Sequence, residues 1–430
     1  MKPFQAILLA VFGILALFAV FLFATYSSRS GTDVGRVVIW GSLPAPLFEE
    51  VLRASGGTQD ELRDVSYEQK PEASLVPSLV EAIAAGRAPD LVLFPASSLV
   101  SEKDKLQPIS YRSISRRQFQ DTFIEAGEVF LASDGIYGLP FYIDPYVTYW
   151  NRTIFSAGGA ARAPRYWDEF TDLAPRLTTQ LETGTLTQSA VALGNWDNVS
   201  GAKDILVSLI KGLGNPIVRF DVEEKIFIAL AERNTEGVAA AESALRFYVE
   251  FSDPVSPVYA WNRSQPPSRD AFVGGLLGVY LGKASELMSI RAANPNLNFD
   301  VAGYPQYRDG GAAVPAVLYA LSIPRGAQNA GGALTIASIL AGSEAQKILV
   351  QTTNLPSVRR DILAVSPENP YEGTFRDAAL NAFVFSDPNP EETDAIFKRM
   401  VENVSSGRLS VSEAVQSAQG ELEILIGRVQ

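Results

Sequence analysis

The chain has 430 residues with no histidine and no cysteine, and 36 Lys and Arg against 48 Asp and Glu give it a formal charge of −12. This length predicts two or three domains with sizeable cores. The two missing residue types exclude imidazole acids or bases, thiolate nucleophiles, disulfides, and metals bound by histidine or cysteine. The acidic balance, with no basic block, argues against nucleic-acid binding. We expect no cofactor, no metal and no catalytic residue.

The first apolar segment, AILLAVFGILALFAVFLFA from Ala6 to Ala24, has no polar side chain. As a helix it would reach about 28 Å, just enough to cross a bilayer. Residues 1–26 are therefore interpreted as a membrane anchor or signal anchor, followed by a polar tether over 27–35. Lys2 before the segment favours a single-pass protein with its body outside the cytoplasm, at the cell surface or in the periplasm. A cleaved signal peptide and a buried core helix remain alternatives.

Residues 36–95 alternate between β-rich runs and amphipathic helical stretches. RVVIW and PDLVLF are typical of buried strands, and Leu75, Leu79, Val80 and Ile83 share one helical face that ends before Gly86. This βαβαβ order predicts a parallel sheet covered by helices. Ligands bind beyond the carboxyl ends of such strands, which here are Trp40-Gly41-Ser42 and Phe94-Pro95-Ala96-Ser97.

Two further signals concern the organisation of the chain. The run GLPFYIDPY at 138–146 has two prolines around an extended stretch and is interpreted as a crossing between lobes. Near the end, Ser410 and Glu413 form a capping box before a helix whose apolar residues repeat at helical spacing. We find no internal repeat and no low-complexity tract.

The catalytic motifs tested do not fit. The glycines of Gly278–Ala284 have the wrong spacing for a phosphate-binding loop, and alanine stands where that loop needs a hydroxyl. No Gly-x-Ser-x-Gly elbow exists. A glycoside hydrolase that uses two carboxylates stays open as an alternative, because Asp144 and Asp197 lie in aromatic surroundings.

Aromatic residues beside polar ones suggest a sugar site, because sugars stack on flat rings and exchange hydrogen bonds with carboxylates and amides. Together with the strand-end residues, the candidates for ligand binding are Trp40, Ser42, Ser97, Tyr142, Asp144, Trp196, Asp197, Trp261 and Asn262. The structural alternative is that the tryptophans are core residues, Asp144 a turn residue and Asp197 part of a helix cap. Trp150 and Trp167 are interpreted as packing residues.

Several segments in order resemble the extracellular solute-binding proteins of ABC transporters, in the family that includes maltose- and oligosaccharide-binding proteins. They are APDLVLF, YGLPFYIDPYVTYWNRTIF, PRYWDEF, ALRFYVEFSDP, AFVGGLLGVYLG, NPNLNFDVAGYPQ, YALSIPRGAQNAGGALTIASILAGSEAQKILVQTTNLPSVRRD and VSSGRLSVSEAVQSAQ. The resemblance implies an α/β, two-lobed periplasmic-binding-protein-like fold with a ligand cleft between the lobes, preceded by the N-terminal helix. Lobe one would comprise 36–142 plus 316–350, and lobe two 146–313 plus 356–430. The crossings would be FYIDP, VPAVLYALS and TTNLPS.

The resemblance also implies a function. The chain would capture a small solute, an oligosaccharide, by lobe closure and present it to ABC permease subunits, as a monomer held at the membrane by its N-terminal helix. The usual lipid-modified cysteine of such proteins is absent here. Alternatives are the glycoside hydrolase, a surface carbohydrate sensor or adhesion module, and a peptide, polyamine or anionic ligand on the same fold.

Overall fold

The computed structural model describes residues 34–234, 236–367 and 369–429. Its first strands are β1 (Val37–Gly41), β2 (Val65–Gln69) and β3 (Leu91–Pro95), and β1 pairs in parallel with both of the others. Helices α2 (Ala45–Arg53), α3 (Gln59–Leu62) and α4 (Glu72–Ala84) connect them. The predicted βαβαβ unit is confirmed.

The apolar faces of these helices explain how the unit folds. Phe48, Val51 and Leu52 of α2 are buried, as are Leu75 and Leu79 of α4. Helix α4 ends where the sequence indicates, because the chain turns into the left-handed region at Gly86, with φ of 66°. Burial of these side chains fixes the helices against the sheet.

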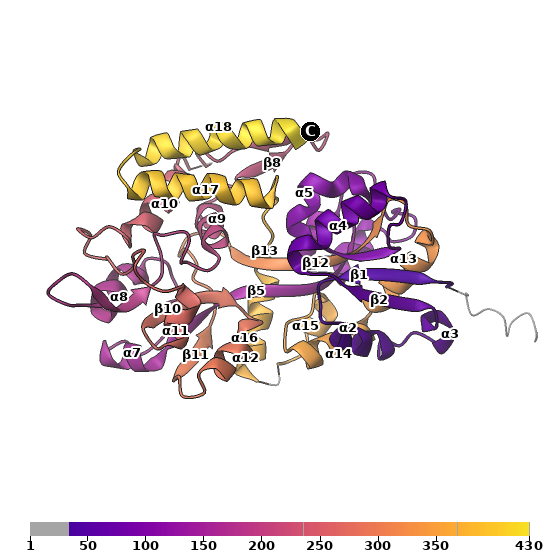
Figure 1. Cartoon of the computed structure of the whole chain (residues 1–430), viewed down its shortest axis with the longest axis horizontal. Helices are drawn as coiled ribbons and strands as arrows, with labels where there is room; N and C mark the ends of the chain where they lie inside the picture. The colour runs from indigo at the N-terminus through magenta and orange to yellow at the C-terminus, as the bar shows by residue number, and fades with distance from the viewer. Residues whose placement is uncertain (1–33, 235, 368, 430) are drawn as a thin grey trace, which may run out of the picture.

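Two long strands, β5 (Leu139–Asn151) and β12 (Val314–Pro324), run from one lobe into the other (Figure 1). They are antiparallel to each other; β12 also pairs with β3, and β5 also pairs with β10 (Leu277–Lys283) and β11 (Phe299–Ala302). With β6 (Thr179–Gln180) and β7 (Leu186–Val191), the main path of the sheet is β2-β1-β3-β12-β5-β10-β7-β6. The stretches expected as the first two crossings, FYIDP and VPAVLYALS, lie inside these strands.

Each lobe has its own hydrophobic core. The first core contains β1, β3 and the start of β5, and it is covered by α13 (Ala330–Leu340) and α14 (Ser343–Thr353). After α14 the chain turns at Asn354, and Leu355 enters the second core. Val358, Leu363, Ala379 and Ala382 lie in the first core, whereas the sequence predicts lobe two for every residue from 356 onward. Other elements of this lobe are η1 (Ala96–Ser98), α5 (Leu99–Glu102), η2 (Lys103–Lys105), β4 (Leu106–Gln107), α6 (Arg116–Thr122), η3 (Glu125–Phe130) and α15 (Arg360–Leu363).

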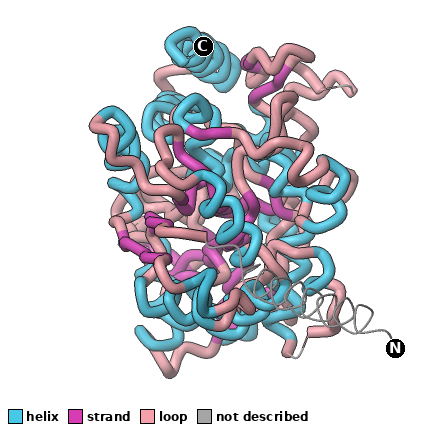
Figure 2. The backbone as a smooth tube through the Cα atoms, turned by 90° about the vertical axis from the view of Figure 1, so that its right-hand side faces the viewer, coloured by secondary structure: helices cyan, strands magenta, loops and turns pink. Residues whose placement is uncertain are grey.

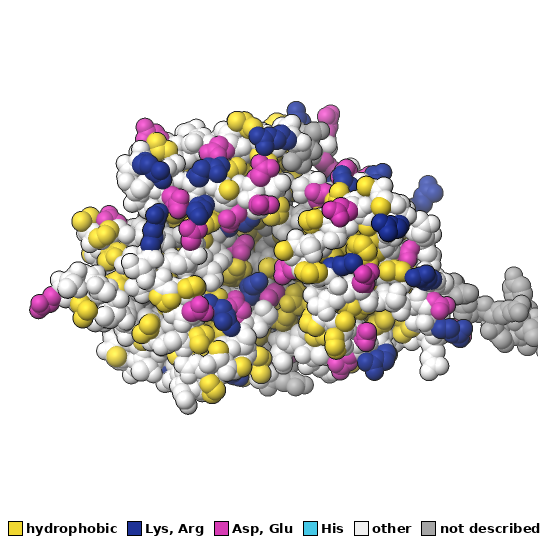
Figure 3. All heavy atoms as spheres, viewed as in Figure 1, with side chains coloured by type: hydrophobic (Ala, Val, Ile, Leu, Met, Phe, Trp, Pro, Cys, Tyr) yellow, Lys and Arg dark blue, Asp and Glu magenta, His cyan; other side chains and the backbone are white. Residues whose placement is uncertain are grey.

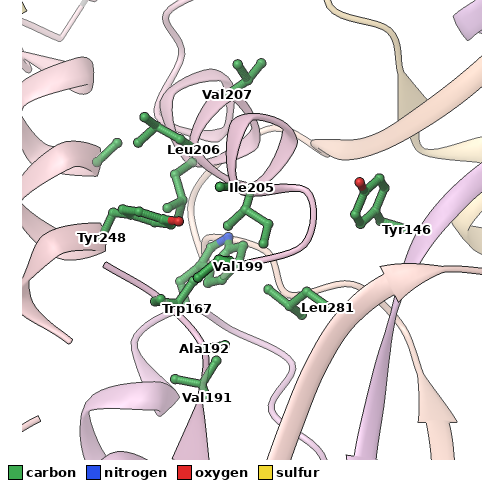
Figure 4. Packing of buried hydrophobic residues seen from close by; sticks show 14 of the residues in the cluster. Tyr146, Trp167, Val191, Ala192, Val199, Ile205, Leu206, Val207, Tyr248 and Leu281 are labelled. Atoms are coloured by element: carbon green, nitrogen blue, oxygen red, sulfur yellow. The ribbon is translucent and has the colours of Figure 1, made fainter. Parts of the chain in front are cut away.

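The second core lies around the other half of β5 and holds Trp167, Tyr248 and the apolar side of α9 (Ala202–Gly212) (Figure 4). Trp167 is fully buried, as its interpretation as a packing residue requires. The remaining elements are α7 (Arg152–Ala157), α8 (Glu169–Leu177), β8 (Val218–Phe220), β9 (Ile226–Ile228), α10 (Ala240–Glu250), α11 (Ser268–Val273), α12 (Glu286–Ala293), α16 (Pro370–Leu380), β13 (Ala382–Phe383), α17 (Pro390–Ser405) and α18 (Val411–Val429). Seen from the side of lobe one, helices lie around the strands (Figure 2).

The expected capping box opens α18: the Ser410 hydroxyl accepts a bond of 3.3 Å from the Glu413 amide, and the Glu413 carboxylate accepts one of 2.9 Å from the Ser410 amide. Within the described ranges no single helix is long and apolar enough to cross a membrane. The expected anchor over 1–26 lies outside the described residues.

Candidate functional site

A cavity of about 480 Å³ lies between the two lobes. Lobe one contributes the start of α4 and the turn after β3, and lobe two contributes the start of α9 and the loop before α17. The middle of β12 forms the wall that joins them, in the region between the lobes seen in Figure 3. The cavity thus lies beyond the carboxyl ends of β2 and β3, where parallel sheets bind ligands.

On the lobe-one side, a tyrosine and a carboxylate are joined by a short hydrogen bond. The hydroxyl of Tyr319, on β12, donates to the carboxylate of Glu72 at 2.6 Å. Burial raises the pKa of Tyr319, and the Glu72 contact raises it further, while a hydrogen bond with the Ser42 hydroxyl lowers it. The Tyr319 ring is tilted against the Tyr142 ring, with 6.1 Å between centroids. Glu72 is the first residue of α4, where the helix dipole favours a negative charge.

A row of hydroxyls follows β3 along the same wall. Ser97, Ser98 and Ser101 all line the cavity, together with Glu102. Ser101 donates to the Ser98 carbonyl at 3.2 Å. Burial raises the pKa of Glu102, against the lowering effect of the nearby Lys105 charge. This wall therefore presents small donors and acceptors beside an acidic group.

On the lobe-two side, Lys203 connects two segments distant in sequence. Its ammonium group lies 2.8 Å from the carboxylate of Asp387 and 2.8 Å from the Pro390 carbonyl oxygen. Asp387 is only 2% exposed, so this ion pair is held in a largely buried position. The contact fixes the loop before α17 against the start of α9.

The neighbouring Asp204 also lines the cavity and accepts a hydrogen bond of 2.8 Å from the Tyr146 hydroxyl. Burial raises the pKa of Asp204, although the bond from Tyr146 and the charge of Lys203 lower it. Gly201, with φ of 69°, comes so close to the Tyr146 hydroxyl that a side chain there would collide with it. Glycine at this position therefore allows Tyr146 to reach Asp204.

Carboxylates dominate the charge of the cavity. Those lining it are Glu72, Glu102, Asp204, Asp387 and Glu391, against the single ammonium group of Lys203, which is already paired with Asp387. Phe385, Leu75 and Val317 add apolar surface. Such a lining can accept hydrogen bonds from hydroxyl or ammonium groups and pack against the faces of a ring.

Of the residues proposed from the sequence, Ser97 lines the cavity directly. Tyr142 and Ser42 lie behind it, in contact with Tyr319. Asp144 lies on β5 with 3% exposure and accepts a bond of 3.0 Å from the Ser285 amide.

The other proposed residues are not among those that line this cavity. Trp261 is 0% exposed and donates to the Asn198 side chain at 3.0 Å, and Trp196 is 7% exposed and donates to Asp394 at 3.1 Å. Both indoles are core groups with satisfied N–H donors. Their polar neighbours have other partners: Asp197 pairs with Lys398 at 2.5 Å, and Asn262 donates to the Tyr259 hydroxyl at 2.7 Å. The Trp40 ring lies under the Lys70 ammonium group, 4.1 Å from it.

Sequence reasoning missed Glu72, Lys203, Asp204, Tyr319 and Asp387. For Glu72 a signal existed, since the strand-end rule applied to β2 points to the start of α4 as it does to β1 and β3. Tyr319 lies in the stretch expected as a crossing. For the rest, no local pattern distinguishes a residue at the cleft from one on the surface.

The fold and the cavity define a class of protein: a two-lobed α/β receptor whose ligand site lies between lobes joined by long strands. The family described as bacterial extracellular solute-binding protein matches residues 63–347. The chain belongs to this family, so it is a solute-binding protein rather than an enzyme, and its body lies outside the cytoplasm.

Solved structures agree in fold. The chain is similar to the cyclic α-maltosyl-1,6-maltose binding protein from Arthrobacter globiformis (16% identity, TM-score 0.74, covering 92% of this chain and 99% of that one). It is also similar to the GacH receptor of Streptomyces glaucescens, solved without ligand and with acarbose (17%, TM-score 0.71, 91% and 98%). A solute-binding protein from Thermotoga lettingae, bound with α-D-tagatose, is a third (19%, TM-score 0.67, 91% and 99%). No curated protein matches the chain.

Proposed function

We propose that the protein captures an oligosaccharide between its two lobes and delivers it to the permease subunits of an ABC importer. The observation that carries this proposal is the cavity between the lobes. Carboxylates line both of its walls, and hydroxyl, phenol and phenyl groups complete the lining. These groups suit a neutral, hydroxyl-rich ring. The similar structures bound with tagatose and with acarbose support the same ligand class.

We propose the lobe boundaries 36–142 plus 316–350 and 146–313 plus 356–430, with one change. The two separate cores support this division, except that Val358, Leu363, Ala379 and Ala382 pack in the first core. The apolar segment within residues 1–26 supports membrane anchoring of the body.

The test is calorimetry of the wild-type chain with maltotriose, followed by Tyr319→Phe. This variant removes the hydroxyl that bonds Glu72 in the cavity wall, so the affinity falls about three- to tenfold. Tyr111→Phe is the matched control, because its hydroxyl bonds the Ala132 carbonyl away from the cavity. If both variants bind like the wild type, Tyr319 does not lie in the ligand site.

A cationic ligand, such as a polyamine or an amino sugar, is the second candidate. It is favoured by the excess of carboxylates over the paired Lys203 in the cavity. Spermidine and glucosamine oligomers belong in the same titration series at low and high salt. A cationic ligand loses affinity as salt rises, whereas a neutral sugar does not. If neither the sugars nor the cationic ligands bind, both candidates are contradicted.

Delivery to a permease needs its own measurement, since a sensor or adhesion module would bind the same ligand. Uptake into vesicles that contain a candidate ABC permease would depend on the added protein if the proposal holds. Ligand binding without stimulated uptake would favour the sensor.

A further inference from the structure

The hairpin formed by β8 and β9 projects from lobe two at the edge of the cleft. Val218 and Ile228, at the base of the hairpin, pack in the second core. In the turn, the Asp221 carboxylate accepts bonds from the amides of Glu223 at 2.8 Å and Lys225 at 2.9 Å. The turn holds Glu224 at φ of 60°, a conformation that side-chain-bearing residues rarely adopt. A fixed turn therefore presents one carboxylate.

That carboxylate binds lobe one through both of its oxygen atoms. One lies 2.6 Å from the Lys103 ammonium group, and the other accepts a hydrogen bond from the Ser133 amide. Lys103 directly follows Glu102, which lines the cavity, so the contact lies at the rim of the cleft. Lys103 is itself held over the Tyr137 ring, 4.7 Å from its centroid.

The environment of this contact makes it stronger than an ordinary surface ion pair. The Lys103 and Glu224 side chains are only 35% and 32% exposed. Burial alone would raise the pKa of Glu224, but the bonds from Lys103 and Ser133 outweigh it and lower the pKa below its ordinary value. The partners therefore favour the charged form, and a charge-assisted bond to a backbone amide adds direction to the attraction.

We propose that Glu224 is a latch: it joins the two lobes outside the ligand cavity and selectively stabilises the arrangement in which the hairpin contacts lobe one, here called closed. The inference rests on the proposed function only in assuming that the lobes open and close. Opening separates the hairpin from Lys103 and Ser133, so both contacts contribute to the closed state alone. By raising the fraction of closed molecules, the latch also tightens ligand binding, because the ligand prefers the closed state.

The test measures closure without ligand, by single-molecule fluorescence transfer in the full chain. The chain has no cysteine, so Glu81→Cys on α4 and Ser417→Cys on α18 place one dye on an exposed site of each lobe. Glu224→Gly removes the latch and suits the left-handed backbone, so folding is preserved. Glu224→Gln removes the charge and keeps an acceptor for Ser133. The matched control is Glu223→Gln, the same charge change one residue earlier.

We expect the ratio of closed to open molecules to fall about three- to tenfold in Glu224→Gly, with a smaller fall in Glu224→Gln. The control stays at the wild-type value. Raising the salt concentration lowers the ratio in the wild type and leaves it unchanged in Glu224→Gly. Transfer distributions and salt responses that are the same in the wild type and Glu224→Gly would overturn the latch.

Calorimetry with maltotriose separates the latch from the ligand. If the ligand proposal is right, the dissociation constant rises by the same factor as the fraction of closed molecules falls. If maltotriose binds none of the variants, the ligand proposal fails, while the transfer measurement still decides whether Glu224 joins the lobes.

Discussion

Replacing Asp144 by asparagine is expected to change how the stability of the protein depends on pH. Asp144 lies on β5, where the strand passes between the lobes, and it is 3% exposed. Burial raises the pKa of its carboxyl group from 3.8 to about 6, although bonds from Ser285 and the charge of Lys283 oppose the increase. The nearby charge of Glu286 adds to it.

The sign and size of the effect follow from the two pKa values. Between pH 4 and pH 6 the folded state holds a proton on Asp144 that the unfolded state has released. The free energy of unfolding therefore falls as the pH rises through this window. At about 1.4 kcal/mol per pH unit, the ionised carboxylate costs the folded state about 3 kcal/mol at pH 7.

Asparagine has no charge to bury, and its amide oxygen can still accept the bond of 3.0 Å from the Ser285 amide. Asp144→Asn should therefore be more stable than the wild type by up to about 3 kcal/mol at pH 7, and equal to it at pH 4. Urea unfolding at half-unit pH steps gives both curves. Asp172→Asn, on the exposed side of α8, controls for the loss of one negative charge. Parallel curves for the wild type and Asp144→Asn would refute the reasoning.

Three other substitutions test the packing around the cleft. Trp261→Ala empties a fully buried position and should lower the free energy of unfolding in urea by about 3–5 kcal/mol. The folded fraction should keep its ligand affinity. A loss of affinity at unchanged stability would show that Trp261 belongs to the ligand site. Lys203→Met leaves the Asp387 carboxylate buried without its ammonium partner, so the thermal midpoint should drop by the equivalent of about 3–5 kcal/mol, and Lys203→Arg should recover part of it. Gly201→Ala introduces a side chain against the Tyr146 hydroxyl and a strained backbone, so both stability and ligand affinity should fall, in contrast with the same change at the open, right-handed position Gly331.

Much of the fold could be predicted because its signals are local. Alternating strands and helices define the first sheet, and Ser410 with Glu413 defines the start of α18. The strand-end rule also located one wall of the cleft through Ser97. These predictions depend on neighbours in sequence, whose arrangement the backbone geometry largely determines.

The site was harder to predict because its groups come from distant segments. Glu72, Lys203, Tyr319 and Asp387 meet only when the two lobes are assembled. An aromatic residue beside a polar one did not separate core from cleft, because a buried indole also needs a hydrogen-bond partner. The indole N–H of Trp261 finds one in Asn198, so the sequence pattern expected of a sugar site also satisfies a core tryptophan.

Tyrosines of the two strands that cross between the lobes, β5 and β12, connect these strands to the two walls of the cavity. Tyr319 on β12 bonds Glu72 in lobe one, and Tyr146 on β5 bonds Asp204 in lobe two. The two strands are paired, with Tyr319 opposite Tyr142. Each wall therefore has a carboxylate that is hydrogen-bonded to one strand of this pair. A change in the angle between the lobes alters the distance between Glu72 and Asp204 more than it alters either tyrosine contact. A ligand that bonds both carboxylates therefore distinguishes open from closed lobes, which is the differential affinity that closure requires.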